Sequence, residues 1–443
     1  MAIRSQEPAT TSGDLVAELR AWLEENWDPD LTVGEWWERL GLAGWSSPTL
    51  PTNAYGRGVS RPEAAALLAE VGRFGALGPP GGLGLLLAAP TIATHGSQEQ
   101  IDLYVRDIVT GRKAWCQLFS EPGAGSDLAG LSTRAQQQDD EYIVNGQKVW
   151  TSGGQTADLG MLLARTDPSV PKHQGITYFA LDMNQPGVDV RPLREMSGHA
   201  LFSEVFFSDA RVGADAIIGE LNNGWAVANT TLMYERAGLG AGGGGSAFGL
   251  AQPGTKAGHL DKRAGDFVAK PGAQAGRRGR VQQLRGGAAS LYIGLAKGNG
   301  TWENPNVRQQ LAQLHILSEI GRFNNERLKA TRASGGDIPG MANIAKLLMS
   351  DIVRLSRDVA LSIVGAQGML HTIDPNEQKV LDEATGNPFL AGITASALMS
   401  PAPSIYGGTD QVQRNIIGER ALGLPKEPRD DHLKPFNEVA RGK

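Results

Sequence analysis

The chain contains a single cysteine, Cys116, among its 443 residues. One cysteine cannot form an intramolecular disulfide, and the apolar neighbours of Cys116 predict a buried thiol rather than a nucleophile. The N-terminus also lacks the charged start and apolar core of a secretory signal. Both absences are typical of proteins from the reducing cytoplasm, and we expect this protein to be cytoplasmic.

Long apolar runs are missing as well. Pro79, Pro80 and several glycines break the most apolar stretch, residues 77–90. A membrane-spanning helix needs about 20 consecutive apolar residues. We therefore expect a soluble protein that does not insert into a membrane.

Positive charge is not in excess, because Lys and Arg total 42 against 47 for Asp and Glu, a formal net charge of −5. Such a chain lacks the cationic surface that nucleic-acid phosphates require, so we expect no nucleic-acid partner. The histidines His199, His315 and His371 are scattered without the spacing of metal ligands, and no metal site is predicted. A Gly-x-Ser-x-Gly elbow is absent around Ser120 and Ser126, which leaves hydrolase chemistry without support.

Glycine, by contrast, is abundant, with 58 residues, about twice its usual share. Residues 115–127 read Trp-Cys-Gln-Leu-Phe-Ser-Glu-Pro-Gly-Ala-Gly-Ser-Asp, an apolar run that enters a glycine loop. Gly123 and Gly125 predict left-handed backbone angles and a close approach to a ligand, with hydroxyls from Ser120 and Ser126 beside it. The loop matches neither a phosphate-binding P-loop nor a dinucleotide-binding fingerprint. It is either a cofactor cradle or an ordinary tight turn.

The periodicity of the apolar residues divides the chain into three parts. Residues 1–114 predict an N-terminal helical domain, residues 115–223 a middle antiparallel β domain, and residues 224–443 a C-terminal four-helix bundle. The fold class is therefore α+β. A Gly-rich, basic insertion near residues 240–290 reads as a solvated insertion or hinge rather than a patch for anionic phosphates.

Within the middle domain, residues 141–150 alternate around Asn145-Gly146. Asn-Gly is the strongest short signal for a two-residue hairpin turn, so we expect a hairpin there. The exit of this segment, Trp150-Thr151-Ser152, combines a large ring with two hydroxyls. It can pack against a planar heterocycle or simply fill the core.

A carboxylate occurs on the apolar face of the helix that begins near Gly224. Its face is defined by spacings of three, four, three and four residues through Trp225, Ala228, Leu232, Glu235 and Leu239. Burial removes water from a carboxylate and raises its pKa, which suits a general base. The alternative is an internal ion pair, for example with Arg236, although adjacent helical residues diverge and pair poorly.

Four motifs together resemble the acyl-CoA dehydrogenases, over nearly the whole chain. They are residues 119–127, residues 145–152, residues 206–212 and the segment Tyr-Gly-Gly-Thr-Asp-Gln-Val-Gln-Arg at 406–414. The resemblance implies a flavoprotein with a helical domain, a β domain and a C-terminal four-helix bundle. It also implies FAD as cofactor and a homodimer or homotetramer with FAD at a subunit interface.

The resemblance carries functional residues over to matching positions. The FAD contacts it implies are Gln117, Phe119, Ser120, Gly125, Ser126, Trp150, Thr151, Ser152, Thr409 and Gln411, with Gln309, Gln367 and Gly368 in segments that a neighbouring subunit supplies. For the acyl-CoA substrate it implies Ser126, Arg236, Tyr406 and Gly407. The family's Arg-x-x-Phe flavin contact is not evident at residues 299–302.

Gly407 is the departure that bears on mechanism, because many family members carry the catalytic glutamate at that position. In other members the catalytic base lies on the earlier helix, just before an arginine. Glu235-Arg236 resembles that arrangement. The family reaction would then have Glu235 take the α-proton of the thioester while a hydride leaves the β-carbon for FAD. The backbone N–H of Gly407 would polarise the thioester oxygen, and an electron-transfer flavoprotein would accept the electrons.

Two other interpretations stay open. The same fold also serves flavin oxidases and monooxygenases, which use oxygen. Gly407 and the missing arginine contact are also compatible with a non-catalytic partner subunit of a heteromeric acyl-CoA dehydrogenase. Acyl groups of straight, branched, aromatic or steroid-like shape are all compatible with the sequence.

Overall fold

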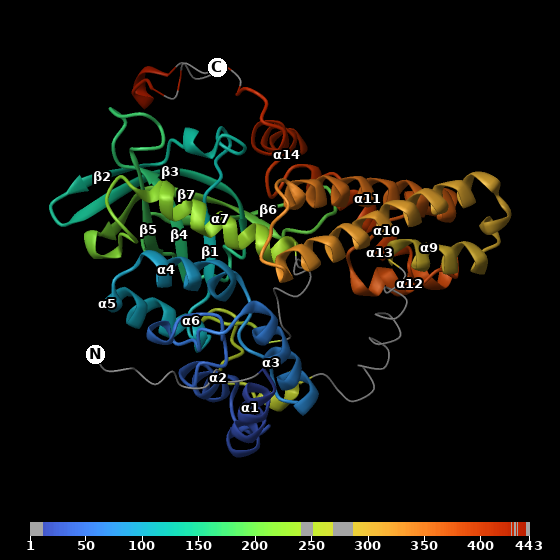
Figure 1. The fold of residues 1–443 in the computed structure, drawn as a ribbon, viewed down its shortest axis with the longest axis horizontal. Helices are drawn as coiled ribbons and strands as arrows, with labels where there is room; N and C mark the ends of the chain where they lie inside the picture. The colour runs from blue at the N-terminus through green and yellow to red at the C-terminus, as the bar shows by residue number, and fades with distance from the viewer. Residues whose placement is uncertain are drawn as a thin grey trace. The chain divides into compact units, whose positions relative to one another are not determined.

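The computed structural model describes residues 12–240, 251–268, 287–426, 428, 431 and 433–439. It divides into two compact units (Figure 1). The first unit comprises Met1–Pro192, Phe202–Ala269 and Asp430–Lys443, and the second comprises Leu193–Leu201 and Lys270–Arg429. This division differs from the boundary expected at residue 223, because the helix that follows Gly224 packs within the first unit.

The N-terminal helices of the first unit begin at strong caps. Thr32 and Glu35 form a capping box for the second helix, and Ser60 and Glu63 form one for the third. The buried indole of Trp36 donates to the carbonyl of Leu77 at 2.7 Å, so it satisfies its polar atom within this small core. The helices are α1 (Ser12–Asn26), α2 (Val33–Leu42) and α3 (Arg61–Phe74).

Two further helical stretches contain π-helical turns. Ser97 caps the second stretch through a capping box with Gln100. The first stretch comprises η2 (Gly84–Ala88) and α4 (Ala89–His95), and the second comprises α5 (Gln98–Gln100), η3 (Ile101–Val105) and α6 (Arg106–Val109).

A seven-stranded sheet forms the centre of the first unit, with strand order β1-β4-β2-β3-β7-β6 and β5 paired to β4. The predicted β domain is confirmed, and the pairs β2/β3, β3/β7 and β4/β5 are antiparallel, whereas β1 pairs with β4 in parallel. The strands are β1 (Trp115–Leu118), β2 (Arg134–Gln138), β3 (Glu141–Ser152), β4 (Leu159–Arg165), β5 (Ile176–Asp182), β6 (Val188–Leu193) and β7 (Phe202–Gly213).

The hairpin predicted at Asn145-Gly146 is wrong. Strand β3 runs through both residues, and the turn that precedes it lies at residues 139–140, where Gln138 pairs with Glu141. The pairing with β7 shifts register between Val144 and Gly146, which marks a β-bulge. A Cβ on Gly146 would stand 2.5 Å from the hydroxyl oxygen of Thr133. Glycine is therefore required there by a close approach inside the sheet rather than by a turn.

Helix α7 (Gly224–Gly240) packs against β5 and η2. A Cβ on Gly224 would stand 2.6 Å from the backbone of Thr177, so the helix starts directly on the sheet. Leu232 and Trp225 pack against the core of the sheet, and Ala228 is fully buried. The predicted apolar face of this helix is confirmed for these residues, while the side chain of Leu239 lies outside the described part.

Residues 251–268, which we call the strap, lie against the N-terminal helices. Backbone hydrogen bonds join Val33 N to Lys262 O and Ala264 N to Leu31 O, each at 2.8 Å, and Ala264 is fully buried. For this segment the expectation of a solvated insertion is wrong, because its apolar residues join the core of the N-terminal helices. The remainder of the predicted insertion, residues 241–250 and 269–286, lies outside the described residues.

The second unit is helical, as predicted for the C-terminal domain, and its helices α9, α10 and α11 lie side by side (Figure 1). None of the helices in the described ranges is long and apolar enough to cross a membrane. The helices are α9 (Gly287–Gly298), α10 (Pro305–Ala333), α11 (Met341–Val364), α12 (Pro375–Thr385), α13 (Leu390–Met399) and α14 (Asp410–Ile416).

Candidate functional site

The loop at residues 119–127 follows β1 and is tied down at both ends. Glu121 forms a buried ion pair with Lys148 of β3 at 2.9 Å, and Lys172 binds Asp127 at 2.8 Å. Lys148 also donates to the carbonyl of Phe119 at 3.0 Å. Two buried charges are held in the interior only when they are paired, so this pair fixes the start of the loop to the sheet.

The Glu121 carboxylate is surrounded by donors. Burial alone would raise its pKa, but the charge of Lys148 and hydrogen bonds from Thr133 and Ser132 hold the pKa of Glu121 below its usual range. The backbone N–H groups of Ser132 and Thr133 donate to it at 2.6 and 2.9 Å. Glu121 is therefore an ionised structural residue that shapes the loop, a role that the sequence reading did not assign.

The glycines of this loop behave differently from the prediction. Neither Gly123 nor Gly125 has a positive φ, so the expected left-handed backbone is wrong. Reciprocal backbone hydrogen bonds at 3.0 Å between Glu121 and Ala124 close the turn without such angles. A Cβ on either glycine would meet no atom within 4 Å. Gly125 and Ser126 are exposed, whereas Phe119 is buried and Gln117 and Ser120 are half-buried.

Trp150, at the end of β3, has the most strained backbone among the predicted cofactor residues. Trp150 has a φ of +61°, which is rare for a bulky residue, and its ring is 57% exposed. The ring makes an edge contact with Phe202 at a centroid distance of 5.7 Å. The strain coincides with a register shift between Lys148 and Thr151, and it leaves a large ring facing solvent.

Thr151, the next residue, is fully buried, and its hydroxyl has no hydrogen-bond partner in the described structure. Leaving a buried polar group unpaired costs about 1–3 kcal/mol, so such groups commonly meet a ligand or water. An exposed ring beside an unpaired buried hydroxyl fits a planar, polar-edged group such as the flavin that the resemblance implies. Ser152, which is half-buried, completes this predicted contact.

Glu235 on α7 is the candidate acid–base group. Burial raises the pKa of the Glu235 carboxyl, opposed by a hydrogen bond from Gln117 and the charge of Arg236. The Gln117 amide nitrogen lies 3.2 Å from Glu235 Oε2, which joins a predicted cofactor residue to the predicted base. Arg236 is exposed and forms no ion pair with Glu235 among the described residues. A carboxyl with a raised pKa and one neutral donor can accept a proton from a bound substrate.

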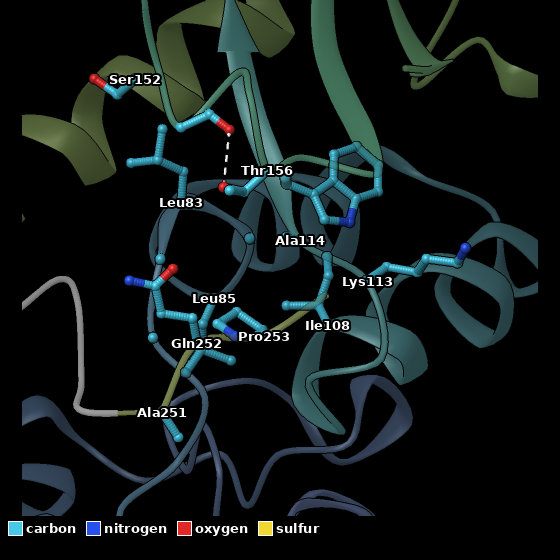
Figure 2. A pocket seen from close by; sticks show the side chains of 15 residues that line it. Leu83, Leu85, Ile108, Lys113, Ala114, Ser152, Thr156, Ala251, Gln252 and Pro253 are labelled. Carbon is cyan, nitrogen blue, oxygen red and sulfur yellow. Dashed lines mark hydrogen bonds between the residues drawn. The ribbon is translucent and has the colours of Figure 1, made fainter. Parts of the chain in front are cut away.

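Ser152 also lines a small cavity of the first unit, shown in Figure 2. The cavity lies between the glycine-rich turn at residues 81–85, the start of β1 and residues 251–253 of the strap. Of these three walls, the sequence analysis had related only the start of β1, within residues 115–127, to a possible site. No sequence pattern predicts this cavity, because the strap reaches it only through tertiary packing.

The remaining predicted site residues belong to the second unit. Tyr406, Gly407, Thr409 and Gln411 share one segment at the start of α14, where Thr409 accepts a hydrogen bond from Val412 N and so caps the helix. Tyr406 and Gln411 are exposed, and Gly407 has a φ of +62°. The other three lie elsewhere in the unit, Gln309 exposed on α10 and Gln367 and Gly368 after the end of α11.

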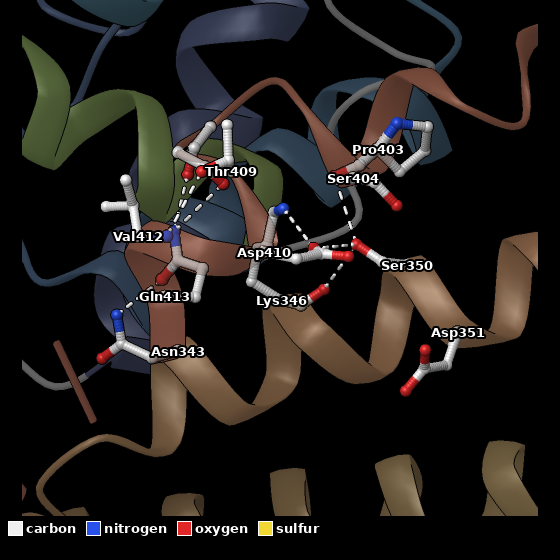
Figure 3. A network of polar contacts seen from close by, with 12 residues as sticks. Asn343, Lys346, Ser350, Asp351, Pro403, Ser404, Thr409, Asp410, Val412 and Gln413 are labelled. Atoms are coloured by element: carbon white, nitrogen blue, oxygen red, sulfur yellow. Dashed lines mark hydrogen bonds and ion pairs between the residues drawn. The ribbon is translucent and has the colours of Figure 1, made fainter. Parts of the chain in front are cut away.

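A buried polar network holds the Gly407 segment (Figure 3). Gln413 donates to the carbonyls of Gly407 and Gly408 at 2.9 and 3.3 Å, and its own oxygen accepts from Asn343 at 2.6 Å. Both glycines have positive φ values, 62° and 84°, which only glycine adopts readily in succession. The network therefore fixes the orientation of these two peptide groups.

Asp410 anchors the same segment to α11. It binds Lys346 at 2.9 Å and Ser350 at 2.8 Å (Figure 3). It also binds Arg354 at 3.1 Å. Burial alone would raise its pKa, but these hydrogen bonds and the nearby charges keep the pKa of Asp410 far below its usual range. The sequence reading missed this network. Its signal is the spacing of three, four and four residues through Asn343, Lys346, Ser350 and Arg354, which puts four polar side chains on one face of a helix.

Cys116 is fully buried, as predicted, and burial raises the pKa of its thiol to about 12. A thiol in that state is an apolar core group and not a nucleophile at neutral pH.

Three family models match successive parts of the chain. They are the N-terminal domain of acyl-CoA dehydrogenases over residues 10–112, the middle domain over residues 116–210 and the C-terminal domain over residues 292–422.

Individual relatives agree with the family models. The acyl-CoA dehydrogenase IpdE1 of Mycobacterium tuberculosis (strain ATCC 25618 / H37Rv) is 31% identical over 392 residues, which cover 88% of each chain. The acyl-CoA dehydrogenase FadE34 of the same organism is 34% identical over 84% of this chain, which spans 44% of FadE34. Among solved structures, the steroid ACAD Tcur3481-Tcur3483 has a TM-score of 0.66 at 27% identity, covering 95% of this chain and 99% of that one.

Proposed function

Because the chain belongs to the acyl-CoA dehydrogenase family, we propose that it forms a 2-enoyl-CoA from an acyl-CoA thioester with Glu235 as the catalytic base. The family is enzymatic and depends on FAD, so the chain is an FAD-dependent acyl-CoA dehydrogenase of lipid metabolism. The acyl group and the residues that act on it are the parts that we propose.

The proposal rests on the environment of the Glu235 carboxyl. Its pKa is raised by burial, and its hydrogen-bond partner among the described residues is the neutral amide of Gln117. A raised pKa makes the carboxylate a stronger base, which favours removal of a weakly acidic α-proton. An ion pair would have the opposite effect, and none is formed among the described residues. In this proposal the proton leaves the α-carbon for Glu235, and bound FAD supplies the acceptor for the β-hydride.

The chain departs from many family members in having Gly407 where they carry the catalytic glutamate. We assign it to the subgroup that takes its base from the earlier helix. Glycine has no side chain to accept a proton. By the family pattern, the carboxylate that can accept the α-proton is then Glu235. The oxyanion contact of the Gly407 N–H and the substrate contacts of Ser126, Arg236 and Tyr406 stay predictions.

For the cofactor, we assign the wall of the flavin site in the first unit to Gln117, Phe119 and Ser120, followed by Trp150, Thr151 and Ser152. The unpaired Thr151 hydroxyl and the exposed Trp150 ring support this assignment. The contacts of Gly125 and Ser126 in this unit, and of Gln309, Gln367, Gly368, Thr409 and Gln411 in the second, stay predictions.

The acyl group that we propose is bulky. The related steroid ACAD supports a ring-bearing acyl chain, and the absence of a side chain at Gly407 leaves room that a glutamate would occupy. A straight-chain acyl-CoA of similar length should therefore be a poorer substrate.

The test is the visible spectrum of the purified protein, followed by anaerobic titration with ring-bearing and straight-chain acyl-CoAs. We expect a yellow protein whose flavin bleaches with the ring-bearing substrate, and reoxidation by an electron-transfer flavoprotein. Bound flavin that no acyl-CoA bleaches would overturn the proposal. Rapid peroxide formation in air would favour the oxidase or monooxygenase. A colourless protein that restores activity to a related chain would favour the non-catalytic partner subunit.

A further inference from the structure

The small cavity beside Ser152 contains an unpaired hydrogen-bond donor. Trp115 lines it, is only 4% exposed, and its indole Nε1 has no hydrogen-bond partner in the described structure. The neighbouring Thr156 hydroxyl already donates to the carbonyl of Gly153 at 3.3 Å (Figure 2). An indole N–H can only donate, so the partner that Trp115 lacks is an acceptor.

The position of the Trp115 ring is well defined. The rings of Tyr104 and Trp115 form a T-shaped pair with a centroid distance of 5.6 Å and an interplanar angle of 89°. The atom Cδ1, which is bonded to Nε1, would lie 3.3 Å from a Cβ on Gly84, another residue of the cavity wall. The edge of the ring that carries the N–H is therefore next to the glycine-rich turn that bounds the cavity.

The strand connects this cavity to Glu235. Trp115 and Gln117 stand two residues apart on β1, so their side chains leave the same face, about 6.6 Å apart along the strand. Gln117 contacts the Glu235 carboxylate. An acyl chain whose α-carbon lies at Glu235 and which runs along β1 towards Trp115 would bring its far end to the cavity.

The size and charge of the cavity restrict which chemical group the far end of the acyl chain can carry. Its volume of about 40 Å³ has room for a few atoms and not for a whole acyl group. The Lys113 side chain also belongs to the wall, but Figure 2 shows it extending away from Leu83 and Gln252. A carboxylate beside the buried indole would lack a cation there, which is unfavourable. An uncharged oxygen, as in a ketone, needs only the N–H.

We propose that the cavity binds a keto oxygen at the far end of the acyl group and that Trp115 Nε1 donates a hydrogen bond to it. This inference rests on the proposed function, since it names the substrate class of the same site. Residues 251–253 of the strap close the cavity opposite the glycine-rich turn: a Cβ on Gly82 would stand 4.0 Å from Pro253 Cγ. Trp115 is thus a specificity-determining residue, and the strap supplies part of the wall around it.

The experiment compares acyl-CoAs that differ only in one oxo group. Hexanoyl-CoA and octanoyl-CoA are compared with their 5-oxo and 7-oxo analogues, and with analogues that end in a carboxylate. The readouts are kcat/KM for flavin bleaching and Kd from calorimetry. We expect the wild-type protein to prefer one oxo analogue over its parent by about tenfold, the effect of one hydrogen bond that would otherwise be unmade.

Trp115→Phe removes the N–H and keeps an aromatic ring against Tyr104, and it should abolish this preference. Trp45→Phe is the matched control, because the Trp45 indole is also buried, and its Nε1 has no hydrogen-bond partner among the described residues, but it does not line the cavity. The control should leave the preference unchanged. If Trp115→Phe does not fold, Gly84→Ala places a methyl group against the N–H edge of the ring and should lower the preference in the same way.

The outcomes separate the inference from the proposed function. If neither these acyl-CoAs nor a ring-bearing acyl-CoA bleaches the flavin, the proposed function fails, and the ratio of Kd values still decides whether Trp115 binds a keto group. If the flavin bleaches but wild-type protein and Trp115→Phe show the same ratio, only the inference fails. A preference for the carboxylate analogues would overturn the assignment of an uncharged oxygen.

Discussion

The side-chain amide of Gln117 donates a hydrogen bond to the carboxylate of Glu235 across 3.2 Å. Gln117 belongs to β1, which leads into the loop at residues 119–127, and Glu235 lies on the buried face of α7. The contact joins the proposed cofactor wall to the proposed base. Burial raises the pKa of Glu235, and the hydrogen bond from Gln117 and the charge of Arg236 oppose that rise.

Glu235→Gln should keep bound flavin but reduce the rate of flavin bleaching by acyl-CoA by about 10²–10⁴-fold, the usual contribution of a general base. Glutamine has nearly the same shape and cannot accept the α-proton. The measurement is anaerobic stopped-flow bleaching at saturating substrate, with the flavin content checked by its visible spectrum. Glu235→Asp, which keeps a carboxylate, is the matched control and should retain more activity. Full bleaching by Glu235→Gln would exclude Glu235 as the base.

Gln117→Leu should move the rising limb of the pH profile for bleaching to higher pH, by about one unit. A donor to a carboxylate stabilises its charged form, so its removal raises the pKa of Glu235 further, and one unit corresponds to roughly 1.4 kcal/mol. The pH dependence of kcat/KM for wild-type and variant protein checks this shift. An unchanged profile would show that Gln117 does not tune the base.

The same substitution has a consequence for stability. A carboxyl whose pKa is raised on folding binds its proton more tightly in the folded chain. Its contribution to stability is present below its unfolded pKa and is lost as the pH rises through the folded value. Gln117→Leu extends that loss to higher pH, so the variant should be destabilised more at about pH 8 than at about pH 5. Urea unfolding at the two pH values measures the difference.

Thr151→Val should weaken FAD binding by about tenfold while leaving the apoprotein equally or more stable. Valine has the shape of threonine without the hydroxyl, and that hydroxyl is buried without a partner when no ligand meets it. The measurements are the FAD dissociation constant by fluorescence quenching and thermal unfolding of the apoprotein. A destabilised apoprotein with unchanged FAD affinity would mean that Thr151 serves the fold and not the cofactor.

Local patterns in the sequence predicted local structure well. The apolar spacing placed Glu235 on a half-buried face, and the apolar neighbours of Cys116 predicted the burial of its thiol. Each of these depends on interactions within a few residues along the chain. The family motifs added the cofactor residues, whose chemistry depends on residue type at fixed spacing.

Predictions failed where tertiary packing decides. Asn145-Gly146 has the composition of a turn, yet the strand continues because Gly146 lies against Thr133. Residues 251–268 are rich in turn residues, yet backbone bonds to Val33 and Leu31 dock them onto the N-terminal helices. The pair of Glu121 and Lys148 is 27 residues apart in the chain and is made by the sheet. No local pattern contains such information.

Lys148→Met should lower the free energy of unfolding by about 3–5 kcal/mol, because it leaves the Glu121 carboxylate buried without its cation. The double variant Lys148→Met/Glu121→Gln removes both charges and should recover much of the loss. Urea unfolding of the three proteins provides the measurement. Equal stabilities of the single and double variants would show that the unpaired charge is not the cause.

Asp410→Asn should destabilise the second unit by about 2 kcal/mol near neutral pH, because hydrogen bonds to charged groups are worth roughly 1.5–3 kcal/mol and Lys346 and Arg354 lose their carboxylate. The matched control is Asp351→Asn. Its carboxylate contacts the same Arg354 but is 53% exposed, so the change should be below about 1 kcal/mol.

The contribution of Asp410 to the free energy of unfolding depends on pH. Because folding lowers the pKa of Asp410 from 3.8, its contribution to stability is complete above that value. It is lost only as the pH falls through the lower folded value. The difference between wild-type protein and Asp410→Asn should therefore stay constant from about pH 7 to about pH 5 and shrink in stronger acid. A difference that grows on acidification would mean that asparagine destabilises the segment for a reason other than the missing charge, and that Asp410 does not hold the Gly407 segment as an ionised group.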